Sequence, residues 1–266
     1  MLQLAASVKI EKTVNDDGLT ASVTVKNVGP GHGIPTGEPM RSMVLTVDAH
    51  CGEQSLQAIG GDVIPDFGGF LEMRTAEESW EDWSEASPGD VLRVVRHTGD
   101  FRDYVGYGPF GDGTFSPDEK GMPVEHFVGE SVVLSVTEEG TILDAPLPEG
   151  DRVYRVSGTV PFEDGMSAIG RAGAPGYGFA RVMVGAQGEL MVPHYLAVDV
   201  ASDNRLMPQQ SWTSAHLFDA PCDDPTVTAT LLYRAYPFRV AAERGWILKE
   251  QKMTCLLYTS PSPRDS

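Results

Sequence analysis

The sequence is poor in basic residues and in long apolar runs. Lysine and arginine number 20 against 38 aspartate and glutamate residues, which gives a net charge of −18 and a pI near 4.6. A chain this acidic has no basic stripe to displace counterions from phosphates, which argues against a nucleic-acid partner and against binding to an anionic membrane surface. No run of about 18 apolar residues occurs, so no membrane-spanning helix is encoded.

Cysteine is also scarce, with only Cys51, Cys222 and Cys255. None of them belongs to a CxxC or CxxCH motif, which excludes a zinc ribbon and covalent haem c attachment within this segment. We therefore predict no metal site in this segment. Cys51 and Cys222 are candidates for one disulfide, with two buried free thiols as the alternative.

Catalytic patterns are missing as well. The serines lack a G-x-S-x-G elbow, and the six histidines show no H-E-x-x-H spacing. Asp112, Asp118 and Glu119 could meet a Ca²⁺ ion, but they lack the EF-hand spacing, and solvated loop carboxylates are the alternative. We therefore predict no catalytic activity in this segment.

What the sequence does contain is alternation with period two. Ala21, Val23 and Val25 share one face of "LTASVTVKNV", and Met43, Leu45 and Val47 do the same in the next such stretch. Further strand-like stretches follow, separated by turn signals such as "NDDG" and "LPEGD". This pattern predicts an all-β fold, an Ig-like antiparallel β-sandwich.

The domain is predicted to cover residues 1–250, with a long irregular insertion at about 60–121 that is rich in glycine and aromatics. A short C-terminal helix is expected in "PFRVAAERGWILKE", 237–250. Residues 251–266 are predicted to be a disordered tail. From residue 255 onwards, "CLLYTSPSPRDS" resembles translated sequencing-adaptor read-through, as at the ends of metagenomic gene predictions, with an ordinary Ser/Pro tail as the alternative.

The N-terminus enters strand-like sequence almost at once and shows no signal peptide. We therefore expect the chain to be a fragment in which Met1 is an internal start.

The most unusual stretch is "NVGPGHGIPTGEPMR", Asn27–Arg41, with four glycines, three prolines and one histidine in fifteen residues. Glycines permit close backbone approach and prolines stiffen the loop, so His32 is expected on a rigid, exposed turn. His32 is a candidate metal or haem ligand. The alternative is a ring that bonds a nearby carbonyl and holds the loop.

A second stretch, "SDNRLMP" at 202–208, combines turn-forming Asp203 and Asn204 with Arg205. Arg205 can pair with Asp203 or form a fork with another carboxylate, as in an inter-domain or haem-propionate contact. The alternative is a purely structural turn with a charged brace.

Asn27–Arg41 resembles the "N-x-G-x-G-H-x-x-P-T-G-x-P-x-R" stretch of the C-terminal β domain in multihaem c-type cytochromes, the family of cytochrome c554 and hydroxylamine-oxidoreductase-like proteins. The stretch that contains 202–208 resembles that domain's "D-x-R-x-P" signature, and "ATLLYRAYP" at 229–237 resembles its closing strand. The residues that match are His32, Pro35, Thr36, Gly37 and Arg41 in the first motif and Asp203, Arg205 and Pro208 in the second, with Gly31 and Asn204 as further structural positions.

The resemblance implies a non-catalytic accessory β domain in periplasmic or extracellular electron transfer. It would bind no haem covalently, and haem c would belong to the parent protein. His32, Arg41 and Arg205 become candidate haem contacts, with an upstream haem-bearing domain or a partner redox protein as the partner. The alternative is a secreted carbohydrate- or surface-binding module that uses Trp80, Trp83, Tyr104 and Tyr107 as an aromatic platform.

Overall fold

All named elements of the computed structural model are β-strands, and every strand pair is antiparallel. The structure describes residues 4–15, 18–67, 72–75, 78–80, 83, 86–101, 123–156, 160–161, 167–168, 171–219, 222, 224–237, 240–241, 244–247 and 250–258. The all-β, antiparallel class predicted from the sequence is confirmed.

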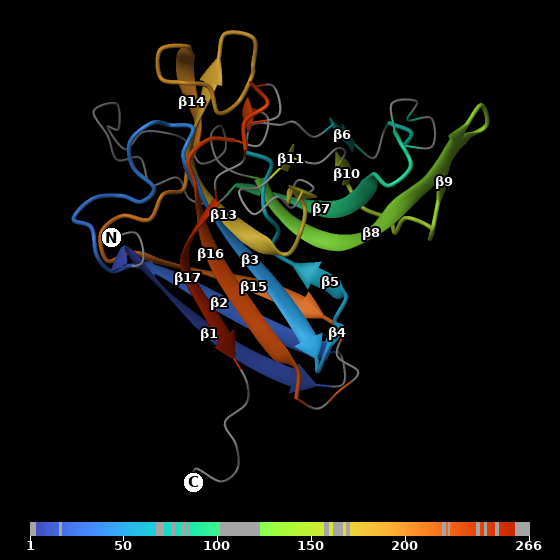
Figure 1. The fold of residues 1–266 in the computed structure, drawn as a ribbon, viewed down its shortest axis with the longest axis horizontal. Helices are drawn as coiled ribbons and strands as arrows, with labels where there is room; N and C mark the ends of the chain where they lie inside the picture. Colours follow the sequence, from blue (N-terminus) through green and yellow to red (C-terminus); the bar gives the residue numbers. More distant parts are fainter. Residues whose placement is uncertain are drawn as a thin grey trace.

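Two sheets pack face to face as a sandwich (Figure 1). The first sheet has the order β1-β2-β15-β5: β1 Ala6–Asn15, β2 Gly18–Asn27, β15 Ser211–Phe218 and β5 Ala58–Gly61. The second has the order β14-β13-β3-β16-β17: β14 Ala197–Asp203, β13 Gly176–Gly185, β3 Ser42–Cys51, β16 Thr226–Arg234 and β17 Glu250–Tyr258, with β4 Gln54–Ser55 paired to β3. The chain crosses between the sheets in the β2–β3 connection, so residues 28–41 lie at one end of the sandwich.

The core lies between these sheets and follows the predicted alternation. On β2, Ala21, Val23 and Val25 are fully buried, while the residues between them are partly exposed. Met43 and Leu45 of β3 are also fully buried and belong to the same cluster. Burying an aliphatic side chain contributes roughly 1.5–3 kcal/mol, so this interior is what holds the two layers together.

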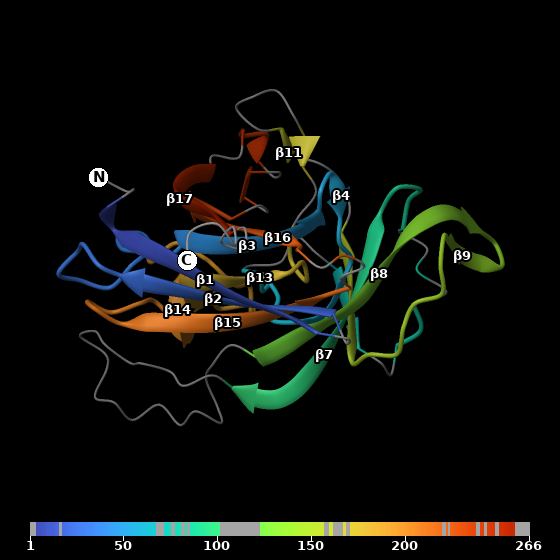
Figure 2. The ribbon, with the colours of Figure 1, turned by 90° about the horizontal axis from the view of Figure 1, so that it is seen from below.

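A third sheet lies beside the sandwich (Figure 2). Its order is β6-β10-β7-β8-β9: β6 Glu72–Thr75, β10 Arg152–Val156, β7 Val91–Phe101, β8 Pro123–Thr137 and β9 Gly140–Leu143. A two-stranded ribbon is formed by β11 Val160–Pro161 and β12 Ser167–Ala168. The prediction of an irregular insertion over 60–121 is therefore wrong at β6 and β7, because pairing with β10 and β8 satisfies their backbone groups. Residues 102–122 lie outside the described part of the chain.

The predicted disordered tail is also wrong for residues 251–258. They belong to β17, which pairs with β16 along its whole length. Met253 is buried, and Leu256 and Tyr258 pack against the core. These apolar contacts and the backbone pairing with β16 explain why residues 251–258 form a strand. Residues 259–266 lie outside the described range.

The short helix expected at 237–250 falls on a stretch that the structure describes only in pieces. There, the Ala241 amide donates to the Pro237 carbonyl at 3.2 Å, and the Trp246 amide donates to the Ala241 carbonyl at 2.8 Å. Gly245 has a φ of 62°, as expected for a residue that ends a helical turn. Val240, Ala241 and Arg244 are α-helical, in agreement with the expected short helix, and residues 242–243 between them lie outside the described part of the chain.

The disulfide between Cys51 and Cys222 is confirmed, with a Cα–Cα distance of 6.1 Å. It joins the end of β3 to the segment that leads into β16, and β3 and β16 are neighbours in the second sheet. The bond therefore fixes the point at which the chain returns from the first sheet to the second.

A buried ion-pair cluster connects β16 to β17 and gives the fold a predicted acid sensitivity. Glu250 accepts hydrogen bonds from Arg234 Nε at 3.1 Å and from Arg171 Nη2 at 3.3 Å. Burial raises the pKa of Glu250, but Arg234 and Arg171 outweigh this effect and hold the pKa below its ordinary value. Because the folded pKa is the lower one, we expect the stabilisation from Glu250 to be present above about pH 4.5 and to be lost as the pH falls through the folded pKa.

Urea unfolding of the wild type and of Glu250→Gln between about pH 6 and pH 3 measures this contribution. The variant should be less stable at pH 6, and the gap in the free energy of unfolding should shrink on acidification. A gap that stays constant over this range would contradict the assignment.

Candidate interaction site at one end of the sandwich

The two stretches singled out in the sequence meet at the end of the sandwich where β2 stops. Asn27, the last residue of β2, is fully buried. Its Nδ2 atom donates to the His32 carbonyl at 2.9 Å and to the Leu206 carbonyl at 3.0 Å. Its backbone amide donates to Gln210 O, and its carbonyl accepts from the Gln209 amide. One asparagine therefore holds both stretches to the sandwich.

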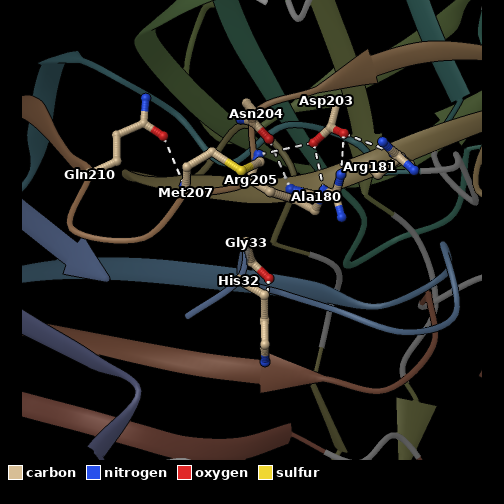
Figure 3. A network of polar contacts seen from close by, with 9 residues as sticks. All are labelled: His32, Gly33, Ala180, Arg181, Asp203, Asn204, Arg205, Met207 and Gln210. Atoms are coloured by element: carbon tan, nitrogen blue, oxygen red, sulfur yellow. Dashed lines mark hydrogen bonds and ion pairs between the residues drawn. The ribbon is translucent and has the colours of Figure 1, made fainter. Parts of the chain in front are cut away.

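A short antiparallel bridge connects the two stretches directly. The Ile34 amide donates to Leu206 O at 2.9 Å, and the Leu206 amide donates to Ile34 O at 3.0 Å. Both side chains are buried in the main core. We call the combined structure, residues 27–41 with 203–210, the end platform. Its two parts lie close together in Figure 3, with His32 and Gly33 on one side and Asp203 to Gln210 on the other.

His32 lies exposed on the end platform, as the sequence predicted. Its Nδ1 atom is 3.0 Å from the Gly33 carbonyl oxygen. A carbonyl oxygen only accepts, so Nδ1 carries the proton in this bond, and the lone pair of a neutral ring is on Nε2. This is the arrangement in which backbone-bonded histidines bind metals. The two interpretations left open by the sequence are thus compatible.

The remaining positions of the first motif shape the loop. Pro35 is buried and follows a cis peptide bond from Ile34, whereas Thr36 and Gly31 are exposed. Gly37 has a φ of 92°, and a Cβ there would lie 2.3 Å from Arg41 Nη1. Only glycine fits under that guanidinium without a shift.

Arg41 is half-buried and donates from Nη1 to the Thr36 carbonyl at 3.1 Å. The guanidinium thus closes the loop on itself, since it also lies against Gly37. At Gly31, in contrast, an added Cβ would meet no atom within 4 Å, so the contacts do not explain that glycine.

Asp203 is the charged centre of the second stretch. Its side chain is fully buried and accepts from two arginines, Arg205 through Nε at 2.7 Å and Nη2 at 2.6 Å, and Arg181 through Nε at 2.8 Å. Arg205 uses both carboxylate oxygens, in the fork geometry that makes such pairs strong. The charged brace considered from the sequence is therefore present, and the Arg205 Nη1 atom donates to no described residue.

Asn204 fastens this turn to β13. Its Oδ1 atom accepts from the Ala180 amide at 2.8 Å, and its Nδ2 atom donates to the Gly178 carbonyl at 2.7 Å. Pro208 is exposed one turn further on. The end platform is thus attached to both sheets, to the first through Asn27 and to the second through Asn204.

Sequence reasoning missed a third part of this end, the segment before β14. Glu38 accepts from the His194 amide at 3.0 Å and lies 2.9 Å from His194 Nδ1. Burial is the largest single influence and raises the pKa of Glu38, but the hydrogen bonds and charge of His194, together with the charge of Arg41, outweigh it, so the net shift is downward. Beside His194, the apolar residues Tyr195, Leu196 and Val198 are 74 %, 53 % and 66 % exposed. Tyr195 and Leu196 lie in the turn before β14, and Val198 lies on β14. Alternation in the sequence does not tell which apolar side chains lack a neighbouring layer.

Other candidate groups from the sequence fare differently. Trp83 is fully buried between Arg74 and Arg155, so it cannot form part of an aromatic binding platform. Trp80 is half-buried, and Tyr104 and Tyr107 lie outside the described residues, as do Asp112, Asp118 and Glu119.

Ser214 Oγ is 2.9 Å from His216 Nε2, a pairing that nucleophilic catalysis uses, but both residues are buried and unreachable by substrate. Within the described residues no three His, Cys, Asp or Glu side chains are placed to hold a metal. Nor does any helix found there have the length and hydropathy to cross a membrane.

No family model and no curated protein sequence matches the chain. Among solved structures, the chain is similar to a penta-haem cytochrome c552 from Thermochromatium tepidum, with a TM-score of 0.43 and 12 % sequence identity. The match covers 97 % of this chain and 40 % of the cytochrome. The likeness is distant, and the chain spans well under half of that protein.

Proposed function

We propose that this chain is a non-catalytic β domain of a multihaem cytochrome c, and that its end platform contacts the haem-bearing module or a partner redox protein. The observation that carries the proposal is the joining of the two signature stretches, about 170 residues apart in sequence, into one hydrogen-bonded structure with an exposed histidine. A loop held at so many points presents its side chains with little conformational freedom, which favours recognition.

The exposed groups on this end suit contact with a haem or an acidic group. His32 presents Nε2, and Arg205 has Nη1 available for a carboxylate such as a propionate. The neighbouring Tyr195, Leu196 and Val198 add apolar surface of the kind found in protein interfaces. If a haem of another module lies here, it would supply one-electron redox chemistry, and His32 would hold or approach its iron.

The disulfide supports an extracytoplasmic location, periplasmic or extracellular. Disulfides persist in oxidising compartments and are rare in the cytosol. The strongly acidic surface is consistent with a soluble exported protein.

His32 is predicted to matter for haem contact and little for folding. Mixing the protein with ferric microperoxidase-11, a haem peptide with an open axial position, should produce a saturable shift of the Soret band. His32→Ala should abolish most of this shift while changing the free energy of unfolding by less than about 1 kcal/mol, because the side chain is exposed.

His194→Ala is the matched control, since His194 is also exposed but bonds Glu38 through its ring. The proposal for His32 fails if both variants bind the haem peptide like the wild type. It also fails if His32→Ala costs several kcal/mol of stability, because the ring would then be a structural element.

A further inference from the structure

A cavity of about 250 Å³ lies where the sandwich meets the third sheet. It is lined by the C-terminal half of β3, whereas residues 27–41 of the end platform precede the first residue of β3. It is bounded by residues of β3, β4 and β5 on one side and of β7 and β8 on the other. β5 and β8 are in contact next to it (Figure 1). Asp62, which follows β5, forms an antiparallel bridge with His126 of β8. The walls therefore come from ordered strands.

The cavity is lined by both apolar and charged side chains. Leu56, Ala58, Phe127 and Phe218 line it and are themselves at most 9 % exposed, so their positions are fixed by packing. Such a combination of apolar walls with a few polar groups is typical of small-molecule sites. The volume suits a ligand smaller than a typical drug.

The positive charge of the lining, on Arg93, is already neutralised. Arg93 donates from Nε to Glu130 at 2.9 Å and from Nη1 to the Ala172 carbonyl at 3.0 Å. Arg93 and Glu130 thus form a closed pair in the wall. An anionic ligand would have to compete with Glu130 for this guanidinium.

Asp48, in contrast, lines the cavity without a hydrogen-bond donor among the described residues. Although it reaches solvent, burial raises its pKa, while Arg171 and His50 lower it to a smaller extent. Arg171 directs its Nη2 to Glu250, so it does not close a pair with Asp48. The charged residues of the lining are Asp48, Glu130 and Arg93, and their sum is −1.

We propose that this cavity binds a small organic ammonium ion, with the cationic nitrogen on the Asp48 carboxylate and a short apolar body against Phe127 and Phe218. The ammonium would supply the donors that Asp48 lacks, and the apolar body would exclude water from the cavity. This site is independent of the end platform and of any haem partner.

Calorimetric titration with benzylammonium chloride tests the proposal. We expect saturable binding with a dissociation constant on the order of 1 mM, as befits so few ligand atoms. Benzyl alcohol and benzoate, which keep the ring and lose the positive charge, should bind at least tenfold more weakly. Asp48→Asn should weaken benzylammonium binding at least tenfold.

Glu139→Gln, which removes the same charge at the exposed β8–β9 turn, should leave the affinity unchanged. Ala174→Leu, which adds volume at the lining, should reduce binding without removing any charge. Thermal unfolding of each variant checks that the fold is intact. Equal binding of benzyl alcohol, preference for benzoate, or equal loss in Glu139→Gln would each overturn the proposal.

Discussion

Asp203→Ala is expected to lower the free energy of unfolding by about 3–5 kcal/mol. The side chain is fully buried and neutralises two guanidinium groups that are themselves mostly buried, Arg181 at 23 % and Arg205 at 16 % exposure. Removing the carboxylate leaves two positive charges near each other in a poorly hydrated place. The energetic penalty comes from losing the negative charge that compensates them, more than from the lost bonds.

Urea unfolding monitored by tryptophan fluorescence measures this loss. The matched control is Asp199→Ala on the same strand, because Asp199 is exposed and its Oδ1 accepts from the amide of the adjacent Val200, so no buried charge is removed. That control should change stability by no more than about 0.5 kcal/mol. If Asp203→Ala costs less than about 1 kcal/mol, the two arginines find water or new partners, and the brace is not what holds the turn.

The prediction also bears on the end platform. Arg205 is followed directly by Leu206, whose backbone bridges to Ile34. A turn that loses its brace should therefore loosen the contact between the two stretches. Amide hydrogen exchange at Ile34 and Leu206 should accelerate in Asp203→Ala and remain slow in Asp199→Ala.

Alternation in the sequence was enough to predict the class of the fold and much of its core. Ala21, Val23 and Val25 lie buried on one face because side chains on a strand alternate and one face of β2 meets the opposite sheet. Met43 and Leu45 follow the same rule on β3. These are local consequences of the backbone and need no knowledge of the partners.

Alternation could not predict the buried residues of a strand whose pairing register shifts along its length. In β17 the register against β16 slips between Leu231 and Leu232, next to Met253. Met253 is buried, and the inward positions then continue at Leu256 and Tyr258, so no single period-two pattern covers the strand. A bulge changes which face each later residue occupies, and it depends on the neighbouring strand.

The candidate site shows the same limit. The sequence indicated His32 and the Asp203–Arg205 group separately, each with two interpretations. Their proximity depends on Asn27 and on a bridge between Ile34 and Leu206. Such contacts between distant parts of the chain are set by the whole fold, so spacing alone could not show them.

Replacing both Cys51 and Cys222 with serine is expected to lower the free energy of unfolding by about 2–5 kcal/mol. The bond closes a loop with a sequence separation of 171, which is long, and restricting a long loop removes much entropy from the unfolded chain. In the folded state the bond spans strands that are already paired, so most of its effect should come from the unfolded chain. Thermal and urea unfolding of the wild type and the double variant measure the difference.

Reductant provides the second arm of this experiment. Treating the wild type with dithiothreitol should bring its stability close to that of the double variant, and the double variant itself should not respond. Cys255→Ser is the matched control, because Cys255 is exposed and unpaired, and it should shift stability by no more than about 0.5 kcal/mol. A wild type that unfolds identically with and without reductant would show that the bond does not form in solution, and it would remove the main argument for an oxidising compartment.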